Sequence, residues 1–177
     1  MTLSYEQKQR NKLNASILKK NQITAIIDTR EQVPFELEKW GLATIRDTLR
    51  HGDYSLANPN MRDLLAIERK SLADLIMCVA QERKRFEYEV RALRGYRYKF
   101  IIVECNLADI YAHNYQSKTN PNAVIASISK WMSLGISFIF AGDARLASEV
   151  TARTLKFIAL EVIGFSKVLC EKEVNDV

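Results

Sequence analysis

Short apolar runs along the chain predict several strands. The β-branched run at residues 23–27 predicts a buried strand that leads into the polar sequence Asp28-Thr29-Arg30-Glu31. Apolar runs at residues 100–104 and 136–140 predict two further strands. Each of these runs is short and bounded by polar residues, which is typical of strands in the interior of a sheet.

Longer stretches with apolar residues at helical spacing predict helices between the strands. Ser71 is a suitable N-cap for a helix that extends to Gly95 with an interruption near Gln81. A second helix is expected over residues 120–132, and Asp143 is expected to cap a final one. Residues 35–50 are expected to form short helical turns broken near Gly41, and residues 106–119 are expected to be irregular.

Two segments with strand character flank an Asn-Pro-Asn turn at residues 58–60 and predict an antiparallel hairpin. Such a hairpin puts Asp53 beside Glu68. Because side chains alternate along a strand, Lys70 points to the same side as Glu68 and Arg69 points to the other. The sequence therefore predicts that two carboxylates and an ammonium converge, as in a metal site with a positioned cation.

Strands alternating with helices after an initial strand and hairpin predict an α/β domain with a central mixed β-sheet flanked by helices. We expect residues 1–20 to form a basic N-terminal arm or short helix, residues 21–166 to form one domain, and residues 167–177 to form a C-terminal tail.

The composition fits a globular domain, with 177 residues of which 47% are apolar and 27% charged. No apolar run reaches the roughly 18 residues of a membrane span, and no secretory signal opens the chain. Three cysteines without paired spacing favour free thiols, so a cytoplasmic protein is expected. The net charge of +5 is a weak indication of nucleic-acid binding, and the basic residues concentrate in residues 1–20 and 81–99.

Phosphodiester hydrolysis needs an activated water and neutralisation of the charge that builds on the phosphate. A divalent cation held by carboxylates supplies both, and Mg²⁺ prefers oxygen ligands. Asp53 and Glu68 are the predicted ligands, with Asp28 as the third acid, and Lys70 is placed to orient water or stabilise negative charge. The alternative is that each acid is an ordinary surface charge at a strand end.

Three motifs in order, Asp28-x-Arg30-Glu31, Gly52-Asp53-Tyr54 and Glu68-Arg69-Lys70-x-x-x-Asp74, resemble the signature of the XPF-type nuclease domain. That family belongs to the PD-(D/E)xK nuclease group, whose fold is restriction-endonuclease-like. The resemblance implies an endonuclease that uses Mg²⁺ or Mn²⁺ to cleave DNA near branches or flaps, in DNA repair or recombination.

Carried over by motif, the resemblance implies a catalytic set in which Arg69 contributes either through its backbone carbonyl or through a structural pairing with Asp74. For Arg30 and Arg69, direct phosphate contact and a salt bridge that fixes the hairpin are both open. The implied catalytic residues are Asp28, Arg30, Asp53, Glu68, Arg69, Lys70 and Asp74, and the implied metal ligands are Asp28, Asp53 and Glu68.

A DNA-binding role is predicted for Arg83, Lys84 and Arg85, because arginine binds phosphate through two parallel hydrogen bonds. Arg83 matches the family arginine by count, and Arg85 is close enough to compete for that assignment. A solvated helix face is the alternative. His51 adjoins the predicted site but heads a strand, so its role is open.

The C-terminal helix-hairpin-helix module of many family members has no counterpart in the sequence, which resembles stand-alone versions of the domain. Branch specificity would then come from the domain, from self-association as a homodimer, or from a protein partner. The alternatives to a structure-specific nuclease are a catalytically inactive DNA-binding or scaffold protein, a less selective nuclease or resolvase of the same group, and an interaction platform.

Overall fold

The computed structural model describes Ser4 and residues 23–175, so the predicted basic arm lies outside the described residues apart from Ser4. A six-stranded sheet forms the centre, with strand order β2-β1-β3-β4-β5-β6. It contains parallel and antiparallel neighbours, which confirms the predicted α/β fold with a mixed sheet. The strands are β1 (Thr24–Asp28), β2 (Ala43–Asp47), β3 (Tyr54–Leu56), β4 (Leu65–Lys70), β5 (Tyr98–Val103) and β6 (Ser137–Phe140).

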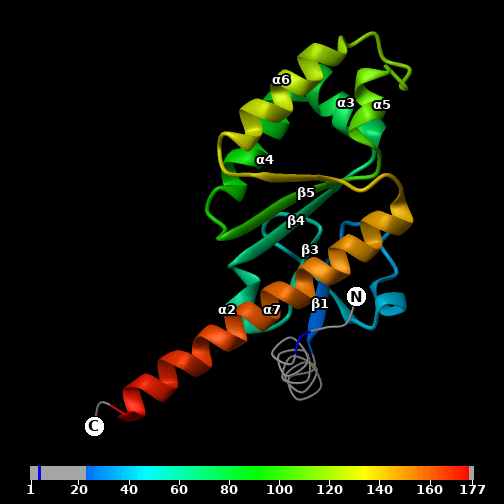
Figure 1. The fold of residues 1–177 in the computed structure, drawn as a ribbon. Coiled ribbons are helices and arrows are strands. Elements are labelled where there is room, and N and C mark those ends of the chain that lie inside the picture. Colours follow the sequence, from blue (N-terminus) through cyan, green and yellow to red (C-terminus); the bar gives the residue numbers. More distant parts are fainter. Residues whose placement is uncertain (1–3, 5–22, 176–177) are drawn as a thin grey trace.

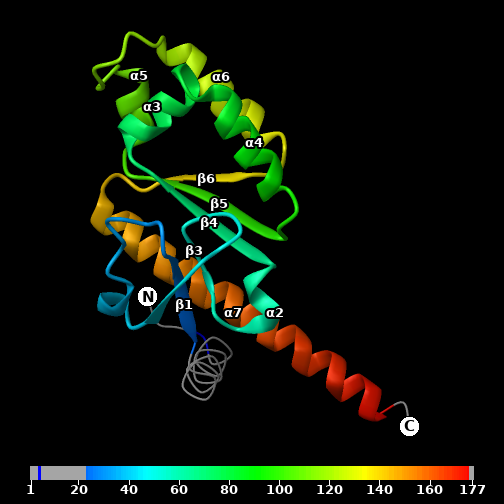
Figure 2. The same cartoon turned by 180° about the vertical axis from the view of Figure 1, so that it is seen from behind.

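Helices cover both faces of the sheet (Figure 1 and, from behind, Figure 2). One face carries α3 (Leu72–Ala80), α4 (Arg83–Leu93), α5 (Leu107–Tyr111) and α6 (Pro121–Met132), and the other carries α7 (Ala144–Asn175). The two remaining elements are a 3₁₀ helix, η1 (Leu37–Trp40), and the short α2 (Pro59–Arg62). Within the described part of the chain, no helix has both the length and the apolar character needed to cross a membrane.

Each face of the sheet has its own hydrophobic core. Leu75, Phe86 and Trp131 belong to the core under α3, α4 and α6. Leu37, Tyr54 and Leu155 belong to the core under α7. Successive side chains of β4 enter opposite cores, with Ala66 in the first and Ile67 in the second. Burial on both faces of the sheet therefore fixes which side chains of β4 point to which face.

The predicted hairpin is confirmed. Strand β3 runs antiparallel to both β1 and β4, with Tyr54 opposite Ile67, so the start of β3 lies beside the ends of its two neighbours. The backbone of Asp53 joins all three, because its carbonyl accepts from the Asp28 N–H and its N–H donates to the Ile67 carbonyl, each at 2.8 Å. Gly52 allows this close approach, since it has φ +79° and a Cβ there would lie 3.0 Å from the Ile67 oxygen.

The helix signals of the sequence are also confirmed. The Ser71 side chain caps α3 by accepting the Asp74 N–H, and the predicted interruption near Gln81 separates α3 from α4. Asp143 Oδ1 accepts the Leu146 N–H at 2.7 Å at the start of α7. That helix continues to Asn175, across the boundary at residue 166 that we predicted between domain and tail.

Two segments differ from the sequence prediction. Residues 35–50 contain the strand β2 as well as the single 3₁₀ turn η1, so the prediction of helical turns alone is wrong. Among the strands that the structure describes, β2 pairs only with β1, and Ile45 is 46% exposed, so β2 lacks the apolar pattern of an interior strand. Residues 106–119 contain α5, which a capping box between Asn106 and Asp109 begins.

Candidate active site

A hollow of about 470 Å³ lies at one end of the central strands, the edge of the sheet where β1 and β4 end and β3 begins. Helices α3 and α4 also contribute to its lining. All seven predicted catalytic residues line it, although 46 positions separate the first from the last in the sequence. They come from the end of β1, the start of β3, the end of β4 and the first turn of α3: Asp28, Arg30, Asp53, Glu68, Arg69, Lys70 and Asp74.

The two acids and the lysine of the hairpin converge as predicted. Lys70 Nζ lies 2.5 Å from Glu68 Oε1 and 5.3 Å from the centre of the Phe86 ring. Asp53 Oδ2 accepts the backbone N–H of Arg69 at 2.8 Å. The Asp53 carboxylate is therefore held against β4, on which Glu68 and Lys70 share one side.

The protonation properties of this group differ from those of surface residues. Burial and the neighbouring Glu68 carboxylate raise the pKa of Asp53 to about 7. Burial also raises the pKa of Glu68, and the adjacent Lys70 ammonium only partly offsets this. Burial works against the charge on Lys70, but Glu68 outweighs it and raises the pKa of the ammonium. Two acids that disfavour ionisation beside a firmly protonated lysine are the kind of group found at functional sites.

Asp28 is held differently, although it lies at the same edge and is only 1% exposed. Its Oδ1 accepts from the backbone N and from Nε of Arg30, at 2.9 and 2.7 Å. Its Oδ2 accepts from Arg30 Nη2 at 3.1 Å and from the Leu49 N–H at 2.7 Å. Although burial opposes ionisation, these hydrogen bonds lower the pKa of Asp28.

Four protein donors thus satisfy the Asp28 carboxylate. Arg30 forms a salt bridge with Asp28, and its side chain remains 65% exposed beside the hollow. Among the described residues, no group of three or more acid, histidine or cysteine side chains is arranged to hold a metal ion. Of the three predicted metal ligands, Asp53 and Glu68 are less occupied than Asp28: Asp53 accepts the Arg69 N–H, and Glu68 accepts from Lys70.

Arg69 points to the opposite side of β4, as strand alternation predicts. Its guanidinium binds Glu31 at 3.1 Å, Glu104, and the Val33 carbonyl, and lies 4.6 Å from the centre of the Phe35 ring. The suggested pairing of Arg69 with Asp74 is wrong, because the Arg69 guanidinium pairs with Glu31 and Glu104 instead. The Asp74 carboxylate accepts a hydrogen bond from Ser71 at 2.7 Å. Arg69 therefore ties the segment after β1 to β4 and β5.

Of the three predicted DNA-binding residues, Arg85 is the one that lines the hollow. It forms ion pairs with Glu82 and Glu89, so its charge is largely matched. Arg83 instead binds Glu87 at 3.3 Å and donates to Ser127 of α6 at 3.1 Å.

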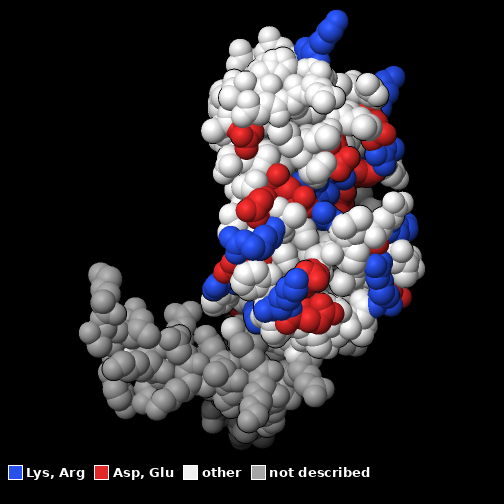
Figure 3. Space-filling model, turned by 90° about the vertical axis from the view of Figure 1, so that its right-hand side faces the viewer, with Lys and Arg blue, Asp and Glu red and all other residues white. Residues whose placement is uncertain are grey.

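Acidic and basic side chains are interleaved on this part of the protein. On the face drawn in Figure 3, both signs crowd together in the middle, while the upper part is largely uncharged. The described residues of that face form no continuous basic stripe.

Several residues that line the hollow were not predicted from the sequence. Glu31 follows Arg30 in the first motif, and Glu89 lies one helical turn after Arg85 on α4. The position of each beside a predicted site residue could therefore have indicated that it lines the site. Gln32, Arg50, Phe86 and Leu93 complete the unpredicted lining. His51, whose role the sequence left open, and Gly52 of the second motif also line the hollow.

Comparison with known proteins agrees with the fold and with the motifs. The model of the ERCC4 domain matches residues 27–154, well over half of the chain, and the chain belongs to this family. No curated protein matches the sequence.

Two solved structures share the fold. XPF from Aeropyrum pernix superposes with a TM-score of 0.63 at 21% sequence identity, over 81% of this chain and 69% of that one. XPF from Aeropyrum pernix in complex with DNA superposes with a TM-score of 0.58 at 22% identity, over 78% of this chain and 65% of that one. The domain therefore has the XPF nuclease fold, and the predicted resemblance is confirmed.

Proposed function

We propose that the chain is a metal-dependent DNA endonuclease that cuts at branched, flapped or distorted DNA. The observation that carries this proposal is the convergence of Asp53, Glu68 and Lys70 in one hollow at the edge of the sheet. Membership of the ERCC4 domain family supports nuclease chemistry, and the relative solved with DNA supports DNA as the substrate.

A divalent cation suits the Asp53–Glu68 pair. Burial and mutual repulsion make two ionised carboxylates unfavourable there, and a bound cation would remove that cost. Oxygen ligands favour Mg²⁺ or Mn²⁺. When bound, the cation would neutralise charge on the phosphate and lower the pKa of an attacking water.

The neighbouring side chains have distinct proposed roles. The Lys70 ammonium stays protonated beside Glu68 and is available to stabilise negative charge on the phosphate. Asp28 positions Arg30 and the segment at Leu49 through its four hydrogen bonds, in place of the metal-ligand role inferred from the motif. Arg69 positions β4 against the segment that follows β1.

Cleavage of labelled flap, fork, four-way-junction and plain duplex DNA with Mg²⁺ or Mn²⁺ tests the proposal. We expect cutting of the branched substrates that is abolished by EDTA and by Asp53→Asn or Lys70→Ala. Glu161→Gln, which removes an exposed carboxylate on α7 outside the active-site hollow, is the matched control and should cut like the wild type. Wild-type cutting no greater than that of Asp53→Asn would refute the catalytic assignment, and equal cutting of plain duplex would refute the structure-specific part.

One observation favours a second candidate, a DNA-binding scaffold of the same fold without turnover. In the described part of the chain, the predicted three-acid metal site is not assembled, since Asp28 is engaged by Arg30 and Leu49. Tight binding of branched DNA without any metal-dependent product would support the scaffold.

A further inference from the structure

A second hollow, of about 450 Å³, lies next to the active site and shares a wall with it. Both hollows are lined by Arg50 and His51, which stand on the segment between β2 and β3. The second is completed by Asp63, Ala92, Gly95 and Tyr96. Its volume is within the range of about 300–1,000 Å³ that is usual for small-ligand sites.

The two hollows adjoin at the C-terminal end of α4. Leu93 lines the first, and its neighbour Ala92 lines the second. Because Arg50 and His51 line both as well, the second hollow is the immediate continuation of the first.

The shared wall is rigidly built. Leu49 is fixed at both backbone groups, because its N–H donates to Asp28 Oδ2 and its carbonyl accepts from Arg30 Nη2 at 2.9 Å. Gly52 packs directly against β4. Between these anchors, His51 Nδ1 lies 3.3 Å from the Tyr96 hydroxyl, and the two rings meet edge to face. A wall whose backbone and His51 ring are fixed in this way leaves only the Arg50 side chain to be ordered on binding.

Arg50 carries an unmatched charge in this wall. It is exposed, and it forms no ion pair with any other residue that the structure describes, unlike Arg30, Arg69 and Arg85. Asp63 is the acid that lines the second hollow, and no ion pair joins these two described residues, Asp63 and Arg50. An anion entering the hollow is therefore attracted to the Arg50 side and repelled from the Asp63 side.

We propose that the second hollow is a subsite for the DNA nucleotide that flanks the scissile phosphate, with Arg50 binding the flanking phosphate and His51 held beside it by Tyr96. The proposal rests on the proposed nuclease function, because the scissile phosphate is the one placed at Asp53 and Glu68. It extends the DNA path beyond the active-site hollow, on the side away from the predicted basic residues at positions 83–85.

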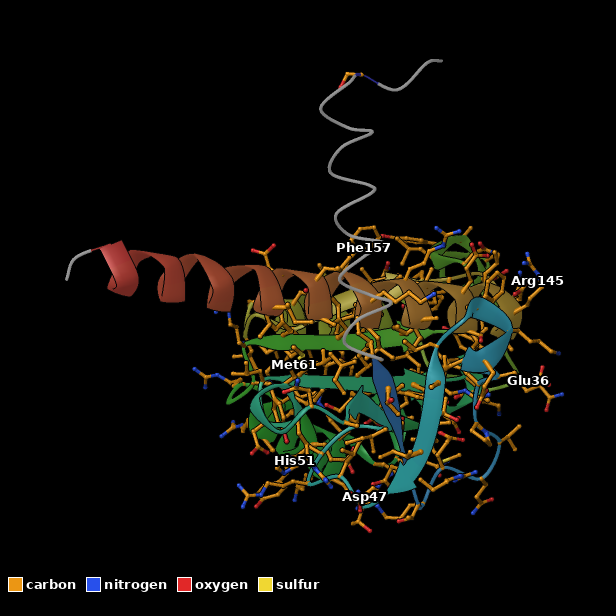
Figure 4. All side chains as sticks on the ribbon, turned by 90° about the horizontal axis from the view of Figure 1, so that it is seen from below. Glu36, Asp47, His51, Met61, Arg145 and Phe157 are labelled. Atoms are coloured by element: carbon orange, nitrogen blue, oxygen red, sulfur yellow. The ribbon has the colours of Figure 1, made fainter. Side chains whose placement is uncertain are left out.

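Equilibrium binding of labelled flap DNA in EDTA, over a series of salt concentrations, tests the subsite without cleavage. We expect Arg50→Gln to weaken binding about five- to tenfold at low salt and to reduce the slope of log K against log[salt] by about 0.9, the value for one phosphate contact. Arg50→Lys keeps the charge and should keep the slope. The matched control is Arg145→Gln, an exposed arginine at the start of α7 that Figure 4 shows well separated from His51.

Equal affinities and slopes for Arg50→Gln and Arg145→Gln would overturn the subsite, and so would a wild-type protein that does not bind DNA. Hydrolysis of bis(p-nitrophenyl) phosphate separates this result from failure of the nuclease proposal, because that diester has no flanking phosphate. Arg50→Gln should lose at least fivefold more rate on DNA than on the small diester, and equal losses would contradict the subsite. A wild-type protein that cleaves neither substrate refutes the nuclease proposal, while the binding comparison still decides the subsite.

Discussion

Asp28 and Asp53 are neighbours at one edge of the sheet with opposite electrostatic environments. Their backbones are joined by a hydrogen bond of 2.8 Å, and both carboxylates line the same hollow. Arg30 and Leu49 surround the first with donors, which lower the pKa of Asp28 against the effect of burial. The second faces another carboxylate, and burial with that repulsion raises the pKa of Asp53 to about 7.

The difference shows that burial and position at a strand end do not define the role of an acid. A carboxylate whose oxygens are occupied by protein donors stabilises the fold and has little capacity left for a ligand. A carboxylate placed beside another one lowers the stability of the fold and gains when a cation binds. On this argument we propose that Asp28 supports the site and that Asp53 acts in it.

The largest expected effect is on catalysis. Asp53→Asn should reduce the rate of DNA cleavage by about 10³-fold or more, which corresponds to about 4 kcal/mol in the activation barrier. The fold-reduction in cleavage rate caused by Asp28→Asn should be at least ten times smaller, provided that the assay temperature lies below the melting temperature of this variant. Single-turnover rates with both variants measure the contrast. Equal losses would show that the two acids share one role in the chemistry.

The next effect is on stability and concerns Asp28. Asp28→Asn should lower the free energy of unfolding at pH 7 by about 2–3 kcal/mol, because it removes charge-assisted hydrogen bonds to Arg30 and Leu49. Since the pKa of Asp28 is lowered in the folded state, this stability is present above pH about 4 and is lost as the pH falls through the folded pKa. Urea unfolding at pH 7 and at pH 3 measures it. A loss that is no smaller at pH 3 would contradict the electrostatic origin.

Replacing Asp53 should change the free energy of unfolding in the opposite direction from replacing Asp28. The folded protein binds a proton at Asp53 more tightly than the unfolded chain does, so stability decreases as the pH rises from about 4 through 7. Asp53→Asn should therefore raise the free energy of unfolding by about 1–2 kcal/mol at pH 8 and by almost nothing at pH 4, because the amide oxygen can still accept the Arg69 N–H. Asp63→Asn is the matched control. A destabilised Asp53→Asn protein at pH 8 would contradict the repulsion that we infer.

The convergence of Asp53, Glu68 and Lys70 could be predicted from the sequence because it depends on local rules. A turn between two strand-like segments set the hairpin, and alternation along β4 decided which side chains share a face. The same rule predicted that Arg69 points away. The three motifs then identified the family, which the match to residues 27–154 confirms.

The contacts that were missed depend on distant parts of the chain. Arg69 reaches Glu31 and Glu104, which are 38 and 35 positions away, and no local pattern links them. Strand β2 was missed because it is an edge strand with exposed apolar side chains. A salt bridge of Arg30 was one of the alternatives that the sequence left open. The Leu49 N–H, which also donates to the Asp28 carboxylate, lies 21 positions away, and no local pattern links the two residues.

The smallest expected effect uses metal binding to separate the two acids directly. Mg²⁺ or Mn²⁺ at about five times its Kd should stabilise the wild type by about 1 kcal/mol, because a ligand that binds only the folded state adds RT ln(1 + [L]/Kd). Thermal melts with and without the ion should show less than half of this stabilisation in Asp53→Asn, which lacks one proposed ligand. Asp28→Asn should melt lower but keep the full increment, because its carboxylate is already occupied by Arg30 and Leu49. If Asp28→Asn also loses the increment, Asp28 is a metal ligand as its motif implies, and its hydrogen bonds must rearrange when the ion binds.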